Sequence, residues 1–292
     1  MEKEKLTNEE NLNLRASNKT EIFKAKFNGE VVISKKISLA SSDKLLRGRI
    51  KKREILIMSY LNADNNQNLV KFHGWIEESN YIKIIMEYLE GKDLYEYIGE
   101  DVKYDLSEKQ KAKILLDVAK GLKFLHERNI IYRDLKSGNV LIDKEITDDT
   151  LDFTAKIVDF GISRKIEEFN QDDPDTDDNS SGMTAKSGTN KYFAPEQDSS
   201  DYDYKVDIYA FAMMAYELFS KTICYSDPIT MRFNDNTLRK KVKEGLRPNK
   251  NLNVDIPQEI LDMCEKNWKL DPEDRETAEE LVETMQDIYE NI

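Results

Sequence analysis

The sequence has few cysteines and no long apolar run. Its two cysteines, Cys224 and Cys264, each lie inside an apolar stretch, which indicates buried thiols in a reducing compartment rather than a disulfide framework. The longest apolar run, residues 208–219, is too short to span a bilayer and predicts a buried core helix. Residues 1–21 are polar and charged, so no secretory signal is expected. These absences predict a soluble, cytoplasmic protein with no membrane span.

Positive charge is also in deficit. The chain has 44 lysines and arginines against 57 aspartates and glutamates, and its formal net charge is −13. Nucleic-acid binding needs a concentrated basic face, so we expect no nucleic-acid partner, and any bound phosphate must be held by a few local cations. The length of 292 residues and the apolar content of 39% suffice for one large or two small packed domains.

The hydrophobic pattern changes character near residue 88. Before that point, Asn28-Gly29 joins two extended runs and predicts a hairpin. Residues 45–61 show helical spacing of apolar residues, and Glu54 falls on the same stripe. Residues 68–76 and 81–89 have the character of strands. After residue 88, capping boxes at 107–110 and 277–280 predict two of several helices.

Polar side chains interrupt the apolar runs in a definite order. Asp134 and Asn139 lie five residues apart in "YRDLKSGN", so a carboxylate and an amide can point into one cleft, and Asp159 ends an apolar run twenty residues later. Upstream, Lys35 lies on a predicted strand, and the inward-facing Glu54 requires a cation, for which Lys35 is the natural partner. Phosphoryl transfer from a nucleotide needs these parts: a cation for the phosphates, oxygen ligands for a metal, and a base beside the acceptor hydroxyl.

The ordered set resembles the signature motifs of the eukaryotic protein kinases. The matching segments are "VISKK" at 32–36, Glu54, "YRDLKSGN" at 132–139, "DFG" at 159–161 and "APE" at 194–196, and the resemblance covers roughly residues 14–288. "EGLRP" at 244–248 and Trp268 resemble the tyrosine-kinase-like branch.

The resemblance implies an α+β, bilobal protein kinase-like fold. A small β-rich N-lobe with one main helix would occupy residues 1–88, with the phosphate-covering loop at 14–22. A larger helical C-lobe would occupy residues 89–292 and carry the activation segment, 159–196.

The resemblance also implies a protein serine/threonine kinase that uses ATP and Mg²⁺. Asp134 would be the base, and Lys136 would neutralise the transferred phosphoryl group and, with Thr189, match the serine/threonine-specific pattern. Asn139 and Asp159 would ligate Mg²⁺. The other residues expected around the nucleotide are Lys35, Glu54, Ile22, Ile33, Met86, Glu87, Leu89 and Leu141.

The expected partner is a protein with a serine or threonine acceptor. Arg133 directly precedes the base, which in this family implies that a phosphate on the activation segment neutralises it. An upstream kinase or autophosphorylation would supply that phosphate, and the sequence does not rank the candidate acceptors Thr184, Ser187, Ser180 and Ser181.

Two departures from the family pattern concern nucleotide binding. Residues 14–22 contain no glycine, and Arg15, Ser17 and Thr20 stand where the pattern has it, so the backbone cannot approach phosphate as closely. Each lost charge-assisted hydrogen bond would be worth about 1.5–3 kcal/mol. Ile33 stands where a small residue packs on the adenine. A register in which Ser34 and Lys36 face inward would remove that second objection.

These departures leave a second function open. A pseudokinase would keep the fold as a signalling scaffold or switch, with weak or no nucleotide binding. The three intact residues Asp134, Asn139 and Asp159 favour the enzyme, because a domain that had abandoned metal binding has little physical need for three such groups in one cleft.

Overall fold

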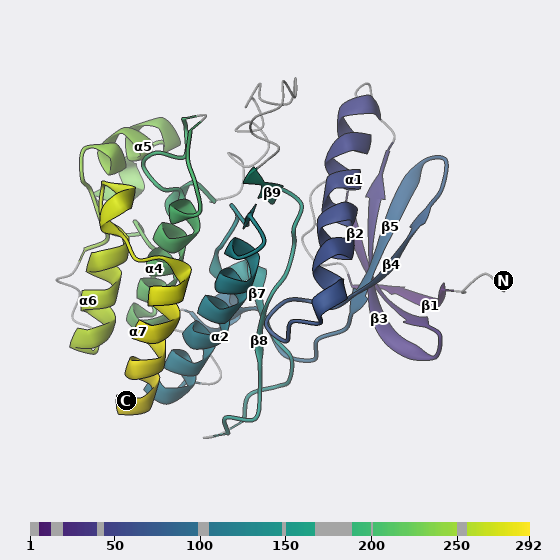
Figure 1. Cartoon of the computed structure of the whole chain (residues 1–292), viewed down its shortest axis with the longest axis horizontal. Helices are drawn as coiled ribbons and strands as arrows, with labels where there is room; N and C mark the ends of the chain where they lie inside the picture. Colours follow the sequence, from purple (N-terminus) through teal and green to yellow (C-terminus); the bar gives the residue numbers. More distant parts are fainter. Residues whose placement is uncertain are drawn as a thin grey trace.

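Two lobes make up the protein in the computed structural model (Figure 1). The structure describes residues 6–12, 20–39, 44–98, 105–147, 150–166, 189–199, 201–249 and 256–292, and within these it describes only the backbone of 44–52 and 189–190. The smaller lobe holds a sheet and one long helix, and the larger lobe is mainly helical. The expected α+β bilobal architecture is therefore confirmed.

An antiparallel sheet of five strands forms the small lobe, in the order β1-β2-β3-β5-β4. Its strands are β1 (Leu6–Asn11), β2 (Thr20–Phe27), β3 (Glu30–Ser38), β4 (Phe72–Glu77) and β5 (Tyr81–Glu87). The predicted hairpin joins β2 to β3 through Asn28 and Gly29, whose φ angles of 52° and 88° suit a tight two-residue turn. The sequence pattern missed β1, because "LTNEEN" has no apolar alternation and the strand is held by backbone pairing with β2.

Helix α1 (Lys44–Leu61) covers one face of this sheet and is followed by the short η1 (Asn62–Asp64). Buried residues of α1 and of that sheet face belong to the main core, among them Ile55, Met58, Ile82 and Ile84. A separate small cluster of Ala25, Phe27, Val32 and Ile85 covers the opposite face. Consequently the side of the sheet on which a residue lies decides whether it faces α1 and the large lobe.

The large lobe is built around α4 (Lys205–Ser220), whose residues Val206–Ser220 are all buried, as expected for the longest apolar run. Both predicted capping boxes are present, at Ser107 and at Thr277. The other elements are η2 (Leu94–Tyr97), α2 (Glu108–His126), β6 (Ile130–Ile131), η3 (Ser137–Asn139), β7 (Val140–Ile142), β8 (Ala155–Ile157), β9 (Arg164–Lys165), η6 (Thr189–Tyr192), η7 (Thr230–Arg232), α5 (Asp235–Lys243), α6 (Gln258–Asn267), η8 (Pro272–Asp274) and α7 (Ala278–Asn291).

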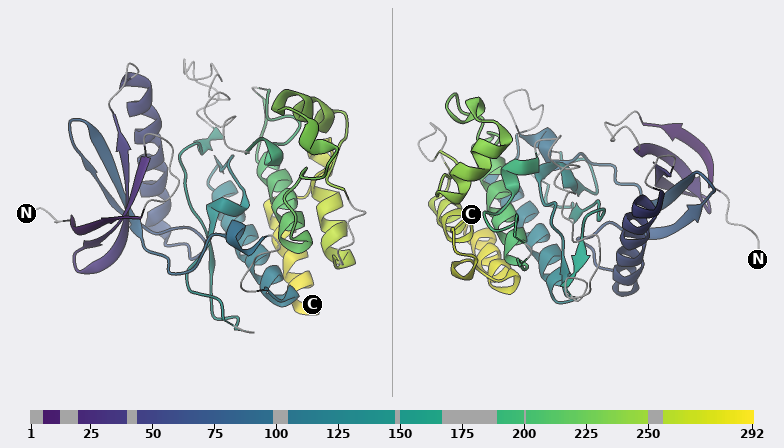
Figure 2. Two further views of the ribbon diagram at one scale, coloured as in Figure 1. Left: turned by 180° about the vertical axis from the view of Figure 1, so that it is seen from behind. Right: turned by 90° about the horizontal axis from the view of Figure 1, so that it is seen from above.

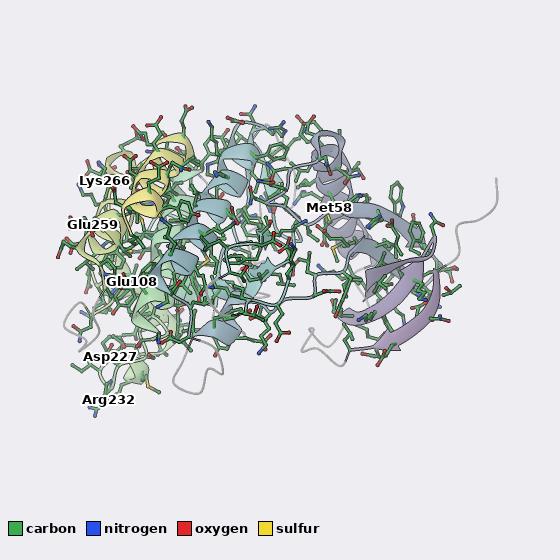
Figure 3. The ribbon with its side chains drawn as sticks, turned by 90° about the horizontal axis from the view of Figure 1, so that it is seen from below. Met58, Glu108, Asp227, Arg232, Glu259 and Lys266 are labelled. Carbon is green, nitrogen blue, oxygen red and sulfur yellow. The ribbon has the colours of Figure 1, made fainter. Side chains whose placement is uncertain are left out.

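Helix α2 packs beside α7, and α4 lies between α2 and α6 (Figure 2). In the view from below, Met58 lies on α1 between the lobes, whereas Glu108, Glu259 and Lys266 lie on helices of the large lobe (Figure 3). Both cysteines are free and buried. Within the described ranges, no helix has both the length and the apolar character needed to cross a membrane.

The connection between the lobes passes close to β7. A Cβ atom on Gly91 would lie 2.5 Å from the carbonyl oxygen of Ile142 and 2.6 Å from that of Lys144. Only glycine allows this approach of two backbones. The connection is therefore held directly against the strand that follows "YRDLKSGN".

Candidate active site

Lys35 lies at the centre of the site. Its Nζ atom is 2.8 Å from Glu54 Oε1 and 2.7 Å from Asp159 Oδ1. The Lys35 and Glu54 side chains are only 12% and 4% exposed, whereas that of Asp159 is 46% exposed. Strand β3, helix α1 and the segment after β8 thus each supply one member of a three-residue ionic cluster.

The register of β3 decides which lysine faces this cluster. Lys35 pairs with Ile22 of β2 and Ile84 of β5, on the face toward α1. Lys36 lies on the opposite face, where its Nζ atom is 2.8 Å from Glu21. The structure therefore places Lys35, rather than Lys36, beside Glu54.

The charges of the cluster stabilise one another. Burial by itself would lower the pKa of Lys35, but the Asp159 and Glu54 carboxylates outweigh burial and raise that pKa above its usual value. The Lys35 charge in turn lowers the pKa of Asp159, although burial opposes this shift. Both groups therefore stay ionised at neutral pH.

Asp134 lies in the loop before η3, and its side chain is 12% exposed. Its Oδ2 atom accepts a hydrogen bond from Asn139 Nδ2 at 2.9 Å and lies 3.0 Å from Lys136 Nζ. Burial raises the pKa of Asp134, and the nearby Lys136 charge opposes this rise. A carboxyl with a raised pKa is a stronger base than an ordinary aspartate.

Backbone strain occurs at both ends of the site. Arg133 has φ of 75° and Asp159 has φ of 59°, a left-handed conformation that arginine in particular rarely adopts. Asp207, 1% exposed on α4, accepts hydrogen bonds from the backbone N–H of Tyr132 at 2.8 Å and of Arg133 at 2.7 Å. This buried carboxylate holds the strained turn in place, and His126 lies 2.9 Å from it.

Residues expected around the nucleotide gather on one face of the sheet. Ile22 is the partner of Lys35, and Ile33 is the partner of Met86. Directly paired residues on antiparallel strands project to the same face, and alternate residues along one strand do so too. These four residues thus share the face that carries the ionic cluster.

The expected residues near the lobe connection have different environments. Leu89 and Met86 are each 8% exposed, whereas Leu141 on β7 is partly exposed. The Glu87 carboxylate accepts hydrogen bonds from Lys156 Nζ on β8 at 2.8 and 2.9 Å. Glu87 therefore links the two lobes by an ion pair that the sequence did not reveal.

The structure upholds the departure at Ile33. Ile33 is partly buried on the same face as Lys35, and Ser34 is fully buried on the other face. The alternative register that would have placed Ser34 toward the nucleotide is therefore wrong. A branched side chain remains where the family pattern has a small one.

Several expected residues lie outside the described part of the chain. They are residues 14–19 of the phosphate-covering loop and the acceptors Ser180, Ser181, Thr184 and Ser187. The remaining residues of that loop, 20–22, are described and form the start of β2. The backbone of Thr189 begins η6, and its side chain is not among those described.

The buried polar network that lies beneath the "YRDLKSGN" segment was not predicted from the sequence. Tyr192 donates a hydrogen bond to Glu217 on α4, and the Tyr192 and Ser137 hydroxyls are 3.0 Å apart. Glu217 is completely buried and also accepts from the backbone N–H of Cys224 at 2.8 Å. The one available signal was an isolated glutamate inside the apolar helix run, which requires a buried partner.

Comparison with known proteins agrees with this geometry. The model of the protein kinase domain family matches residues 18–285. The serine/threonine-protein kinase VIK of Arabidopsis thaliana is 31% identical over 275 residues, which cover 93% of this chain and 58% of that protein. Serine/threonine-protein kinase STY17 of the same plant is 27% identical over 287 residues, covering 90% of this chain and 45% of its own length.

A probable serine/threonine-protein kinase of Dictyostelium discoideum, kinX, is 28% identical over 272 residues, covering 91% of this chain and 22% of its own length. The chain thus spans between 22% and 58% of the length of these three relatives. Because the family model matches nearly the whole chain, and the Lys35–Glu54 ion pair stands beside the aspartate of "DFG", the chain belongs to the protein kinase domain family.

Proposed function

We propose that this chain is a protein serine/threonine kinase that transfers the γ-phosphate of ATP to serine or threonine hydroxyls. The observation that carries the proposal is the ionic cluster, in which Lys35 contacts Glu54 and Asp159 at the same time. A lysine held in this way is ready to bind phosphate oxygens. The names of the relatives, all serine/threonine kinases, support the same activity.

In this proposal each polar residue has one task. Asp134 accepts the proton of the acceptor hydroxyl, whose oxygen forms a bond to the γ-phosphorus while the bond to the departing ADP breaks. Lys136, beside Asp134, offsets the charge on the transferred group, and with Thr189 it supports the preference for serine and threonine. Lys35 binds the α- and β-phosphates, and Glu54 keeps it in place.

Asn139 and Asp159 are the residues that would hold Mg²⁺. This ion prefers oxygen ligands, and the two side chains offer an amide oxygen and a carboxylate. The lowered pKa of Asp159, caused by Lys35, keeps its carboxylate ionised near neutral pH, so the donor set fits. When bound, the ion would neutralise charge on the nucleotide phosphates.

The natural partner in this proposal is a protein substrate. Phosphorylation of the activation segment at Thr184, Ser187, Ser180 or Ser181, by this chain or by an upstream kinase, would neutralise Arg133. The two free cysteines support a reducing, cytoplasmic location.

Neighbouring lysines on β3 provide a matched test. Lys35→Met is expected to abolish phosphate transfer, because it removes the phosphate-binding cation and takes that positive charge away from the buried Glu54 carboxylate. Lys36→Met makes the same substitution at the next residue of β3, whose side chain lies on the opposite face of the sheet, and this variant should keep full activity. Both variants and the parent would each be incubated with ATP, Mg²⁺ and a serine/threonine peptide library as the acceptor. Mass spectrometry would then measure the phosphate added to the intact protein and to the peptides.

Phosphorylated products with the parent and with Lys36→Met, and none with Lys35→Met, would support the enzyme. A parent that shows neither product nor thermal stabilisation by ATP would favour the pseudokinase. Equal activity of the two variants would contradict the assigned role of Lys35.

A second expected result concerns Ile33. Ile33→Ala should strengthen ATP binding by about tenfold, because removing the branched side chain widens the space on the face that carries Lys35. Isothermal titration calorimetry would measure the dissociation constant. Val32→Ala is the control: Val32 is fully buried in the cluster on the opposite face, so its truncation should lower the unfolding temperature and leave ATP affinity unchanged. Weaker binding by Ile33→Ala would contradict this expectation.

A further inference from the structure

The end of helix α1 is fastened to the large lobe by two pairs of side chains. Asp64, the last residue of η1, accepts hydrogen bonds through Oδ2 from Arg128 Nη2 at 2.7 Å and from Arg128 Nε at 3.0 Å. Tyr60, in the last turn of α1, has the Lys165 ammonium 3.8 Å from its ring centroid. We call these four residues the α1 clamp.

The large lobe presents both cations from a fixed frame. Arg128 follows the end of α2, and its guanidinium lies 3.5 Å from the ring centroid of Phe124 and donates to the Phe124 carbonyl oxygen at 3.2 Å. Lys165 lies on β9, where it pairs with Ile130 of β6. Because the Arg128 guanidinium is already oriented by its own lobe, little of its side-chain freedom remains to be lost when it binds Asp64.

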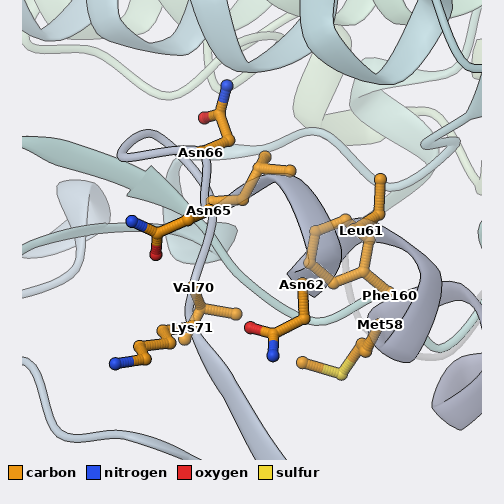
Figure 4. Close-up of a pocket in the computed structure, with 9 residues that line it drawn as sticks. Met58, Leu61, Asn62, Asn65, Asn66, Val70, Lys71 and Phe160 are labelled. Atoms are coloured by element: carbon orange, nitrogen blue, oxygen red, sulfur yellow. The ribbon is translucent and has the colours of Figure 1, made fainter.

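The clamped end of α1 also contacts the segment that carries Asp159. Figure 4 shows a small pocket at this end, and Phe160, the residue after Asp159, points into it beside Met58 and Leu61. The residues lining the pocket are Met58, Leu61, Asn62, Asn65, Asn66, Leu69, Val70, Lys71 and Phe160. A movement of this end of the helix would therefore disturb the packing of "DFG" as well.

Backbone hydrogen bonds already hold the loop beyond the helix. Ile157 N–H donates to the Asn68 carbonyl oxygen at 2.9 Å, and Val70 N–H donates to the Ile157 carbonyl oxygen at 3.0 Å. These bonds fix where the chain leaves α1, but they do not fix the direction of the helix axis. The α1 clamp acts on the last turn of the helix and on η1, where it can fix that direction.

Glu54 lies far enough from the clamp that a small change in the direction of the α1 axis moves it appreciably. Glu54 lies seven residues before Leu61, which is about 10 Å along the helix axis. A tilt of about 10° about the clamped end would move Glu54 by about 2 Å, enough to break its 2.8 Å contact with Lys35. We propose that the four α1-clamp residues are positioning residues that keep Glu54 on Lys35. Their effect on phosphate transfer rests on the proposed kinase function.

Charge exchange across the first pair gives a direct test. Asp64→Arg and Arg128→Asp each place like charges together, so amide hydrogen exchange in residues 53–61 should rise by about two- to fivefold. The same variants should lower kcat and raise the KM for ATP by similar factors. The double variant Asp64→Arg/Arg128→Asp restores an opposite-charge pair and should return both readouts most of the way. Asp152→Arg, at an exposed ion pair with Lys144 in the large lobe, is the control and should change neither.

The second pair is tested by the chemistry of the ring. Tyr60→Phe keeps the aromatic face over which Lys165 lies, so exchange in α1 should stay at the parent level. Tyr60→Leu and Lys165→Met each remove one partner and should raise exchange, and combining them should add little to either alone. A merely packing role for Tyr60 would instead make Tyr60→Leu and Lys165→Met additive.

The exchange measurement needs neither nucleotide nor activity. Two outcomes would overturn the α1 clamp. One is amide hydrogen exchange in residues 53–61 that is unchanged in both Arg128→Asp and Lys165→Met. The other is a double variant, Asp64→Arg/Arg128→Asp, whose exchange does not return toward the parent rate. If the parent transfers no phosphate, the proposed function fails, and the exchange data still decide whether the clamp orients α1.

Discussion

Asp134→Asn is expected to lower kcat for phosphoryl transfer by about 10²–10⁴-fold, the contribution of a well-placed general base. Asparagine keeps the size of the side chain but cannot accept the hydroxyl proton. ATP binding should be retained, because the Lys35–Glu54–Asp159 cluster does not include Asp134. Steady-state kinetics and ATP-dependent thermal shifts would separate the two effects.

Loss of folding would not explain such a result. Burial raises the pKa of Asp134, so its charged form is disfavoured in the folded protein, and the neutral isostere should not lower the unfolding temperature. Asp152→Asn removes a carboxylate whose side chain is 86% exposed and should keep full activity. A kcat for Asp134→Asn within a factor of a few of the parent value would remove Asp134 from the role of base.

Glu196→Ala is expected to reduce the free energy of unfolding by about 3 kcal/mol, the lower end of the range for breaking a buried ion pair. The Arg275 side chain is completely buried and donates to the two carboxylate oxygens of Glu196 at 2.6 and 2.9 Å. Three carbonyl oxygens, those of Lys269, Lys205 and Leu270, would remain as acceptors and hold the loss at the lower end. Denaturant unfolding followed by circular dichroism would measure it.

The double variant Glu196→Leu/Arg275→Met should be less destabilised than Glu196→Ala. The penalty in the single variant comes from leaving a buried charge without its partner, and the double variant removes both charges. A double variant that is less stable than Glu196→Ala would show that the hydrogen bonds of Arg275, to Glu196 and to the three carbonyl oxygens, outweigh the cost of the unpaired charge.

Much of the architecture was predictable because it rests on local signals. Asn28-Gly29 specifies its turn by backbone conformation, and the capping boxes at Ser107 and Thr277 specify helix starts by neighbouring hydrogen bonds. The apolar run at 208–219 had to be removed from contact with water, and it forms the buried core helix α4. Strand β1 was missed because only its pairing with β2 makes it a strand.

The candidate site was predictable in its residue types, in their order and in the pairing of Lys35 with Glu54, but its contacts between the two lobes were not predictable. The order of Lys35, Glu54, Asp134, Asn139 and Asp159 along the chain indicated the chemistry. Two ion pairs join residues from the two lobes, Glu87 with Lys156 and Asp64 with Arg128. No local sequence pattern in any of these segments indicates which residue the partner is.

By itself, the sequence determined the lobes, several of the helices and the chemical groups available for phosphate transfer, because periodicity, turn residues and capping are properties of short segments. The tertiary structure alone decided which of two adjacent lysines meets Glu54 and on which face Ile33 lies. In a strand, a shift of one residue exchanges the two faces, and only pairing with β2 and β5 and packing against α1 select the register.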